Sequence, residues 1–304
     1  MSTAAARTLY VRRSDSDPTW NAKDTTMDSI TPINTDKPAA LAARYGAAVP
    51  AAGPWNDVIA SLMMHRSVRG FRTDPVPTGT VETLVAAAQS ASTSSNLQTW
   101  SVVAVHDPAK RKELVRIANN QKHIEVCPLF LVWVADVSRN ERLASEEGAT
   151  LEGLPYLETF LVAAIDAALA AQNATVAAES LGLSMVYIGA LRNDPEGVAK
   201  LLNLPKGAMA VFGMCVGYAT PAGAGEVKPR LSQRAILHHD VYDAAAERAL
   251  RADYDKEMAD FSARQKMPAS DWSGRVIDRL GKIPALSGRE KLKGQVNALG
   301  FPLK

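Results

Sequence analysis

Residues 156–181, YLETFLVAAIDAALAAQNATVAAESL, form the longest helical pattern in the chain. Apolar residues such as Leu157, Leu161 and Leu169 recur there at helical spacing, and Gly182 supplies a stop. Alanine dominates the remaining faces, so the helix is apolar nearly all round. Such a helix is normally buried, and its small side chains let a neighbour approach closely. The stretch therefore predicts either a central core helix or a helix at a dimer interface.

Apolar runs on both sides of this helix are typical of buried strands, and amphipathic segments between them predict shorter helices. The predicted strands are 100–105, 129–135, 184–189 and 209–218, the last interrupted by Gly213 and Gly217, and the intervening helices are 81–89, 109–119 and 195–202. Strands that are separated by helices indicate a layered architecture that combines helices with a sheet.

Length and composition limit the classes of protein. The 304 residues suffice for one large domain or two small ones, and a net charge of +2 gives no electrostatic case for nucleic acid. No apolar run is expected to reach the length of a membrane span. Arg12-Arg13 resembles a twin-arginine export signal, but a polar segment follows it, so the expected location is cytoplasmic. Cys127 and Cys215 have apolar neighbours, which favours buried free thiols over a disulfide.

The two ends of the chain differ in pattern. Residues 1–52 mix small and polar residues without periodicity and predict a disordered or loosely ordered N-terminal arm before a domain at 53–304. A helix is expected at 57–64, and 141–155 is expected to be a mobile loop. Towards the C-terminus a helix at 244–261, a basic loop reaching Trp272 and a further helical region with Arg289 are expected.

The pentapeptide His65-Arg66-Ser67-Val68-Arg69 directly follows the helix at 57–64. It combines two guanidinium groups, an imidazole and a hydroxyl, and guanidinium groups make paired hydrogen bonds to phosphate. A solvated surface would explain such a run equally well. The alternatives are an anion site and an exposed turn.

No nucleophile, metal site or phosphate-binding glycine loop is evident in the sequence. The histidines and cysteines lack the spacing of zinc ligands, and Asp166 and Glu179 are explained by helix-surface or interface charges. The remaining polar clusters supply many hydrogen-bond donors and few acids. Such a set suits a phosphorylated cofactor that itself carries the reaction, with no catalytic side chain and no metal.

Several motifs occur in an order that resembles a known family. They are the pentapeptide 65–69, the Ser-rich loop ending in Asn96-Leu97-Gln98, Gln121-Lys122-His123, the segment 186–193 (VYIGALRN), and Lys228-Pro229-Arg230. Together these motifs resemble the FMN-dependent nitroreductases, specifically the oxygen-insensitive, NADPH-preferring group A enzymes and the related flavin reductases.

The resemblance implies an α+β fold, with a central mixed sheet flanked by helices, in a domain-exchanged homodimer that holds FMN at its interface. The implied FMN ligands are His65, Arg66, Ser67, Lys228 and Arg230 for the phosphate and ribityl chain, Arg69 and Gln121 for the pyrimidine edge, Tyr187, Ile188 and Gly189 along the ring, and Ser94, Ser95 and Leu97 from the partner subunit. A cation at the pyrimidine edge would stabilise the reduced ring.

The resemblance also implies a ping-pong reaction in which NADPH, or alternatively NADH, reduces the flavin and a nitroaromatic, quinone or related acceptor then takes the electrons. Arg264 and Lys266 fit the family's basic loop for the 2′-phosphate of NADPH, and Arg289 is expected near the acceptor pocket. The chain departs from the family in having Ala190 where a second glycine is common. The alternatives are a reductase that supplies free reduced flavin and a flavin-storage protein without turnover.

Overall fold

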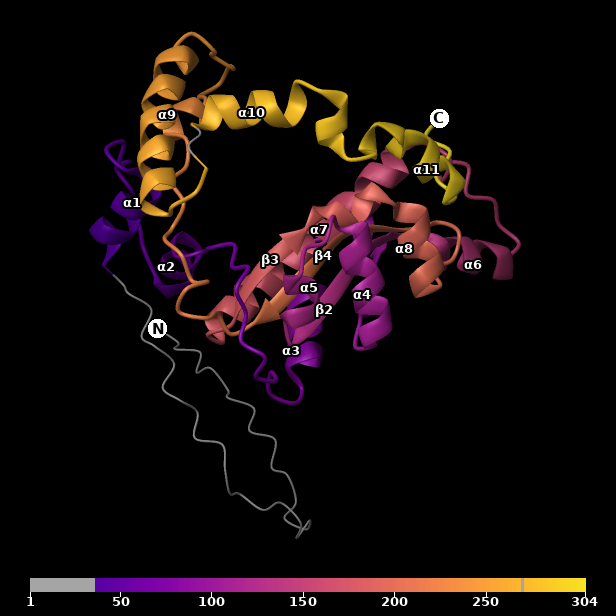
Figure 1. Cartoon of the computed structure of the whole chain (residues 1–304). Helices are drawn as coiled ribbons and strands as arrows, with labels where there is room; N and C mark the ends of the chain where they lie inside the picture. The colour runs from indigo at the N-terminus through magenta and orange to yellow at the C-terminus, as the bar shows by residue number, and fades with distance from the viewer. Residues whose placement is uncertain (1–35, 269–270) are drawn as a thin grey trace, which may run out of the picture. The chain divides into compact units, whose positions relative to one another are not determined.

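A four-stranded sheet forms the centre of the protein in a computed structural model that describes residues 36–268 and 271–304 (Figure 1). The strands are β1 (Trp100–Ala104), β2 (Leu129–Asp136), β3 (Ser184–Ile188) and β4 (Ala208–Gly217), in the order β1-β2-β4-β3. Each predicted strand is confirmed to within one residue at either end. Neighbouring strands pair antiparallel throughout, so the prediction of a mixed sheet is wrong for these strands. The parallel pairing described outside them is a single bridge between Ser67 and Met185.

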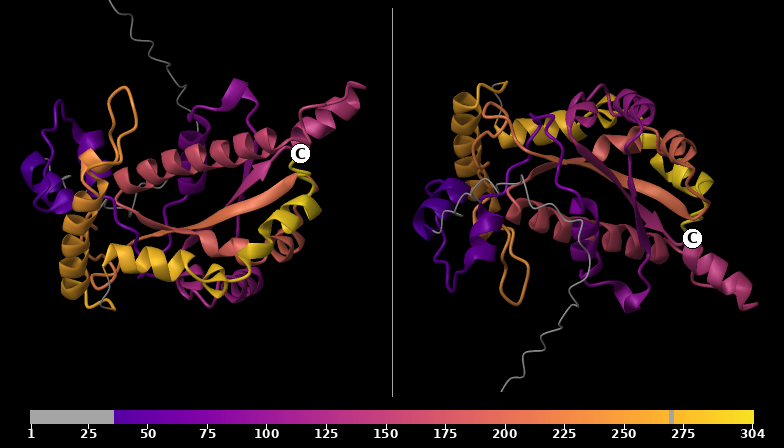
Figure 2. Two further views of the ribbon diagram at one scale, coloured as in Figure 1. Left: turned by 90° about the horizontal axis from the view of Figure 1, so that it is seen from above. Right: turned by 90° about the horizontal axis from the view of Figure 1, so that it is seen from below.

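Strand β2 shows how the layers are built, because all eight of its residues are buried. Side chains alternate between the two faces of a strand, so consecutive residues enter different cores. Leu129, Leu131 and Trp133 pack with α3 (Thr80–Gln89) and α7 (Leu157–Ser180). Phe130, Val132 and Val134 pack on the opposite face with α4 (Pro108–Ile117), α5 (His123–Val126) and α8 (Pro195–Leu202). The sheet therefore lies between two helical layers, as Figure 2 shows from above and below.

Helix α7 combines a buried and an exposed face. Ala170, Ala171, Ala174 and Ala178 are fully buried in the core with β2, and alanine is small enough for this close packing. An 18-residue window of α7 does reach the length and hydropathy of a membrane span, contrary to expectation, and 39% of that window is buried in the fold. The burial against the sheet is that of a core helix, which confirms one of the two alternatives for this stretch.

The opposite face of α7 is apolar but exposed. Leu157, Leu161, Ile165 and Leu169 follow one another at intervals of four residues and are 43–55% exposed. Residues spaced by four lie on one side of a helix, so the four form a continuous apolar stripe.

The remaining helices correct two sequence predictions. They are α1 (Lys37–Tyr45), α2 (Asp57–Met63), α6 (Ser138–Glu146), α9 (Glu247–Arg264), α10 (Trp272–Leu280) and α11 (Leu292–Ala298). Helix α6 occupies part of the stretch that was expected to be a mobile loop. Helix α1 lies within the expected N-terminal arm, and its residues Ala40, Leu41 and Arg44 are buried. Residues 1–35 of that arm lie outside the described residues.

Two of the three acidic residues of α7, Asp166 and Glu179, are not exposed surface charges. Asp166 is 2% exposed and accepts hydrogen bonds from Thr93 and Thr99 and from the amide of Ser94. It thus holds the Ser-rich loop at 90–98 against the helix. Periodicity did not reveal this role because the partners lie about 70 residues away in the sequence. Cys127 and Cys215 are both buried and free, as predicted.

Candidate functional site

The pentapeptide 65–69 lies in an extended segment beside β3. The amide of Val68 donates to the carbonyl of Met185 at 3.0 Å, and the amide of Arg72 donates to the carbonyl of Tyr218 at 2.9 Å. Val68 and Phe71 are buried in the core that contains β3 and β4. These two apolar anchors fix the segment, while the polar side chains between and before them stay accessible.

A second basic segment, Lys228-Pro229-Arg230, is fixed by contacts with α1 and α9. Val227 just before it is buried. The Tyr254 hydroxyl of α9 donates to the carbonyl of Pro229 at 2.9 Å, and the amide of Arg230 donates to the carbonyl of Arg44 at 2.9 Å. The loop is therefore ordered by side chains from other elements rather than by strand pairing.

The two segments line one cavity of about 330 Å³, here called the cation cavity. Its walls include His65, Arg66, Ser67, Arg69, Lys228 and Arg230, together with Gly70, Ala222, Gly223, Ala224, Gly225, Glu226, Phe261, Gln265 and Met267. The fold thus joins six of the predicted ligands, which lie about 160 residues apart in the sequence, at one site.

The cation cavity is strongly positive. Burial lowers the pKa of Lys228, and the charges of Arg275, Arg69 and Arg230 lower it further. The acids around it are engaged: Glu226 pairs with Arg264 at 3.1 Å, and Glu179 pairs with the Nδ1 atom of His65 at 2.7 Å. Several cations that repel one another in a half-buried space favour the binding of an anion.

Two glycines form one wall of the cation cavity. A Cβ atom on Gly70 would lie 2.9 Å from the Cα atom of Gly223, and one on Gly223 would lie 2.6 Å from the Cα atom of Gly70. Only glycine permits this approach of the two backbones. No local sequence pattern marks Gly223, because its partner Gly70 is distant in the chain.

A second cavity of about 360 Å³ lies at β3 and β4 and is here called the tyrosine cavity. It is lined by Ala168, Gln172, Tyr187, Gly189, Arg192 and Phe212. Tyr187 packs edge-on against Phe212, with ring centroids 5.0 Å apart, and its hydroxyl lies 2.9 Å from that of Thr175. Burial raises the pKa of Tyr187 to about 12, so its hydroxyl stays protonated at neutral pH. Ile188 is 1% exposed and packs in the core, so its side chain does not line this cavity.

Arg69 lines the cation cavity and also acts electrostatically on His123 in the segment at 121–123. Burial lowers the pKa of His123, and the charge of Arg69 lowers it further. The Nε2 atom of His123 is buried and has no hydrogen-bond partner among the described residues. Gln121, half-buried, lies two residues before His123, so the unpartnered ring nitrogen and this side-chain amide are close together in the sequence.

Other predicted ligands lie outside both cavities of this single chain. Ser94 and Ser95 lie on an exposed turn with Leu97, and Ser95 has a φ of 49°. Arg264 and Lys266 flank Gln265, which lines the cation cavity. Arg264 is 53% exposed in its side chain and pairs with Glu226.

Three charged residues near the cavities were not predicted as ligands or supports. Glu179 holds His65, Arg192 lines the tyrosine cavity, and Arg44 joins the two basic segments. Burial lowers the pKa of Arg192, as does the charge of Arg279. Isolated charges of this kind carry no local motif, so only their tertiary contacts identify them.

Known proteins resemble the chain over most of its length. The nitroreductase family model matches residues 62–218, and the C-terminal domain model of the same family matches residues 228–304. An FMN reductase (NADPH) from Bacillus subtilis is 37% identical over 251 residues, covering 81% of this chain and 98% of that protein. An oxygen-insensitive NADPH nitroreductase from Salmonella typhimurium is 39% identical over 200 residues, covering 66% and 80%.

Solved structures agree with these matches. A nitroreductase from B. subtilis superposes with a TM-score of 0.76 at 36% identity, covering 81% of this chain and all of the other. An NADPH:FMN oxidoreductase from Vibrio harveyi, complexed with NAD+, gives a TM-score of 0.73 at 33% identity, covering 82% and 100%. The chain therefore belongs to the nitroreductase family of oxidoreductases.

Proposed function

We propose that the chain is an FMN-dependent NAD(P)H oxidoreductase that reduces nitroaromatics, quinones or related small acceptors. One observation carries the proposal. The cation cavity brings together five side chains that match the family's phosphate and ribityl ligands, and Arg69, which matches a pyrimidine-edge ligand, at a site whose electrostatics favour an anion.

The residues present fit FMN. Arg66, Lys228 and Arg230 would hold the phosphate, with His65 and Ser67 supporting it and the ribityl chain, because charge-assisted hydrogen bonds from guanidinium groups bind phosphate strongly. Arg69 would lie at the pyrimidine edge with Gln121, near the unpartnered Nε2 atom of His123. When bound, FMN would supply the hydride chemistry by accepting electrons from the nicotinamide and passing them to the acceptor.

The side chains of the tyrosine cavity would shape the reaction without a catalytic acid or base. Tyr187 is protonated at neutral pH, and Thr175 holds its hydroxyl, so it serves as a wall. Phe212 and Tyr187 would exclude water from the space beside Gly189. Because the cofactor carries the electrons, no protein nucleophile is required.

A homodimer would complete this site. The exposed stripe of Leu157, Leu161, Ile165 and Leu169 on α7 supports pairing with a second copy, since contiguous exposed apolar surface marks interaction sites. Ser94, Ser95 and Leu97 would then reach the partner's flavin. We assign Arg264 and Lys266 to the 2′-phosphate of NADPH, and the cytoplasm as the compartment, where free thiols persist.

The test uses the purified full chain. Its visible spectrum should show bound flavin, and anaerobic NADPH should bleach it faster than NADH. A protein that stays colourless and does not bind added FMN would refute the proposal. Bound flavin that neither NADPH nor NADH reduces would indicate a flavin-storage protein. Equal rates of flavin reduction by NADH and NADPH would contradict the assignment of Arg264 and Lys266 to the 2′-phosphate.

The names of two relatives favour a second candidate function, which is the supply of free reduced flavin. The B. subtilis protein is an FMN reductase and the V. harveyi protein an NADPH-flavin oxidoreductase, each 37% identical to this chain. Release of reduced flavin through a dialysis membrane during turnover would favour this function, whereas retention of all flavin by the protein would exclude it.

A further inference from the structure

Helix α1 contributes a buried arginine that is hydrogen-bonded to the backbones of residues lining the cation cavity. The family models match the chain from residue 62 onward, so α1 (Lys37–Tyr45) precedes the matched part. Arg44, near the end of this helix, is only 6% exposed. A guanidinium group is seldom buried to this degree unless its hydrogen bonds are satisfied.

The guanidinium group of Arg44 binds both segments that carry the cations of the cavity. Its Nη2 atom donates to the carbonyls of Met63 at 2.6 Å and His65 at 2.9 Å. Its Nη1 atom donates to the carbonyl of Lys228 at 2.9 Å. The Arg44 carbonyl accepts from the amide of Arg230 at 2.9 Å. One residue therefore ties the start of the pentapeptide to the loop at 228–230.

These bonds hold the pentapeptide and the loop at 228–230 at a fixed distance, although no strand pairing joins the two segments. The planar fork of arginine presents several donors in a rigid arrangement, so it can hold three carbonyls in a fixed relation. The backbones of the proposed binding residues His65, Lys228 and Arg230 are each bonded to Arg44, while their side chains line the cavity. Preorganised ligands of this kind lose less entropy on binding.

Burial of Arg44 and its repulsion by other positive charges are unfavourable, and a bound anion would offset them. Burial lowers the pKa of Arg44, and the charge of Arg230 lowers it further. The same repulsion acts within the cation cavity, where Arg69 and Arg230 lower the pKa of Lys228. A phosphate in the cavity would relieve this accumulation of positive charge.

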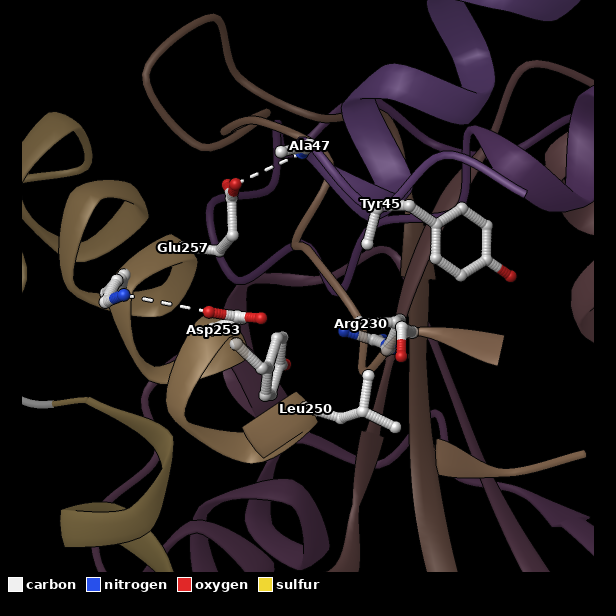
Figure 3. A pocket seen from close by; sticks show the side chains of 10 residues that line it. Tyr45, Ala47, Arg230, Leu250, Asp253 and Glu257 are labelled. Carbon is white, nitrogen blue, oxygen red and sulfur yellow. Dashed lines mark hydrogen bonds and ion pairs between the residues drawn. The ribbon is translucent and has the colours of Figure 1, made fainter. Parts of the chain in front are cut away.

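The turn after α1 is anchored to α9, which keeps Arg44 in place. The amide of Ala47 donates to the carboxylate of Glu257 at 3.1 Å, as Figure 3 shows. Gly46 has a φ of 56°, and a Cβ atom there would collide with the same carboxylate. Tyr45 and Arg230 line the adjoining cavity of about 380 Å³, together with Leu250 of α9. Helix α1 is thus docked at both the cation cavity and α9.

We propose that Arg44 is a positioning residue that sets the spacing of the two basic segments and so selects for flavins that carry a phosphate. This inference rests on the proposed function, because it takes FMN as the ligand of the cation cavity. It places a determinant of cofactor affinity in a helix that precedes the matched family region.

The experiment compares FMN with riboflavin, which lacks the phosphate. The full chain is stripped of flavin, and dissociation constants for both flavins are measured by fluorescence quenching. For Arg44→Ala we expect the dissociation constant of FMN to rise about tenfold or more and that of riboflavin by about twofold or less. Arg44→Lys keeps the charge but cannot reach three carbonyls, so it should show a smaller shift in the same direction.

Arg111 offers a matched control elsewhere in the fold. It is 8% exposed and donates to the carbonyls of Val105, Cys127 and Pro128, as Arg44 does to three others. Arg111→Ala should lower the thermal midpoint while the ratio of the two dissociation constants stays unchanged, because it holds no phosphate ligand.

The outcomes separate the inference from the proposed function. Equal weakening of FMN and riboflavin in Arg44→Ala, or the same change of ratio in Arg111→Ala, would overturn the positioning role. A wild-type chain that binds neither flavin would instead overturn the proposed function. If Arg44→Ala does not fold, Arg44→Lys decides the matter, and an unchanged ratio in that variant contradicts the inference.

Discussion

The cation cavity and the tyrosine cavity differ in what holds their walls. The cation cavity is formed mainly by irregular segments at 65–70 and 222–230, whose arginines, together with burial, lower the pKa of Lys228. The tyrosine cavity is formed by β3, β4 and α7, with Tyr187 packed against Phe212. A charged side chain in the first therefore serves a ligand at some expense to stability, whereas a residue in the second belongs to the core. Mutations in the cation cavity should therefore mainly weaken ligand binding, and mutations in the tyrosine cavity should mainly lower the stability of the fold.

The largest expected effect is on folding, at the strand that supplies Phe212. In Gly213→Ala the new Cβ atom would lie 2.4 Å from the Phe130 ring, in a core that cannot expand freely. We expect the free energy of unfolding to fall by about 3 kcal/mol, measured by urea denaturation. Gly153→Ala is the control, since nothing lies within 4 Å of its Cβ position. Equal stability of the two variants would show that core packing does not fix the wall of the tyrosine cavity that β4 forms.

The next effect is on binding. The double variant Arg66→Ala/Lys228→Ala should weaken FMN binding about a hundredfold, because two charge-assisted contacts to phosphate are lost. The thermal midpoint of the flavin-free protein should stay unchanged or rise, since repelling charges are removed. Lys112→Ala/Arg116→Ala removes the same charge from the exposed face of α4 and should alter neither quantity appreciably. A large loss of stability in the cation-cavity variant would contradict the expected difference between the two cavities.

Arg69 should separate binding from electron transfer. Arg69→Ala is expected to slow reduction of the flavin by NADPH about tenfold, because under the proposed function a cation near the pyrimidine edge would stabilise the reduced ring. The dissociation constant of FMN should rise by less than about threefold, since other cations hold the phosphate. Stopped-flow bleaching and fluorescence titration measure the two quantities. Losses of equal size would place Arg69 with the phosphate ligands.

The smallest expected effect is a dependence on pH. The pKa of Lys228 is lowered by burial and by neighbouring arginines, so it loses its proton below the usual lysine range. In that window the unfolded chain binds more protons than the folded one, so the stability of the flavin-free protein should rise with pH. FMN binding should weaken severalfold over the same window because the cation is lost.

Lys228→Arg tests this explanation, since arginine keeps its charge at alkaline pH. In that variant the dissociation constant of FMN should be flat where the wild type rises. A wild-type affinity that does not change up to about pH 10 would assign the phosphate to Arg66 and Arg230 instead.

Much of the fold could be predicted from local patterns. The four strands and the long helix have the periodicities of buried elements, and their ends were predicted to within one residue. Helix α6 was mistaken for a loop because it buries little, with Ser138 and Ala144 its buried residues. The sheet was expected to be mixed, and strand direction cannot be derived from the pattern of a single strand, since pairing depends on the path of the whole chain.

The sequence by itself determined the elements, the cations and the family resemblance, because periodicity and short motifs are local properties. Only the tertiary structure decided that Glu179 pairs with His65, that Asp166 holds the Ser-rich loop, and that Gly70 packs against Gly223. The same holds for Arg44, whose three carbonyl partners lie 19, 21 and 184 residues away. Each of these roles is a contact between distant residues, and no residue type or spacing encodes such a contact until the chain has folded.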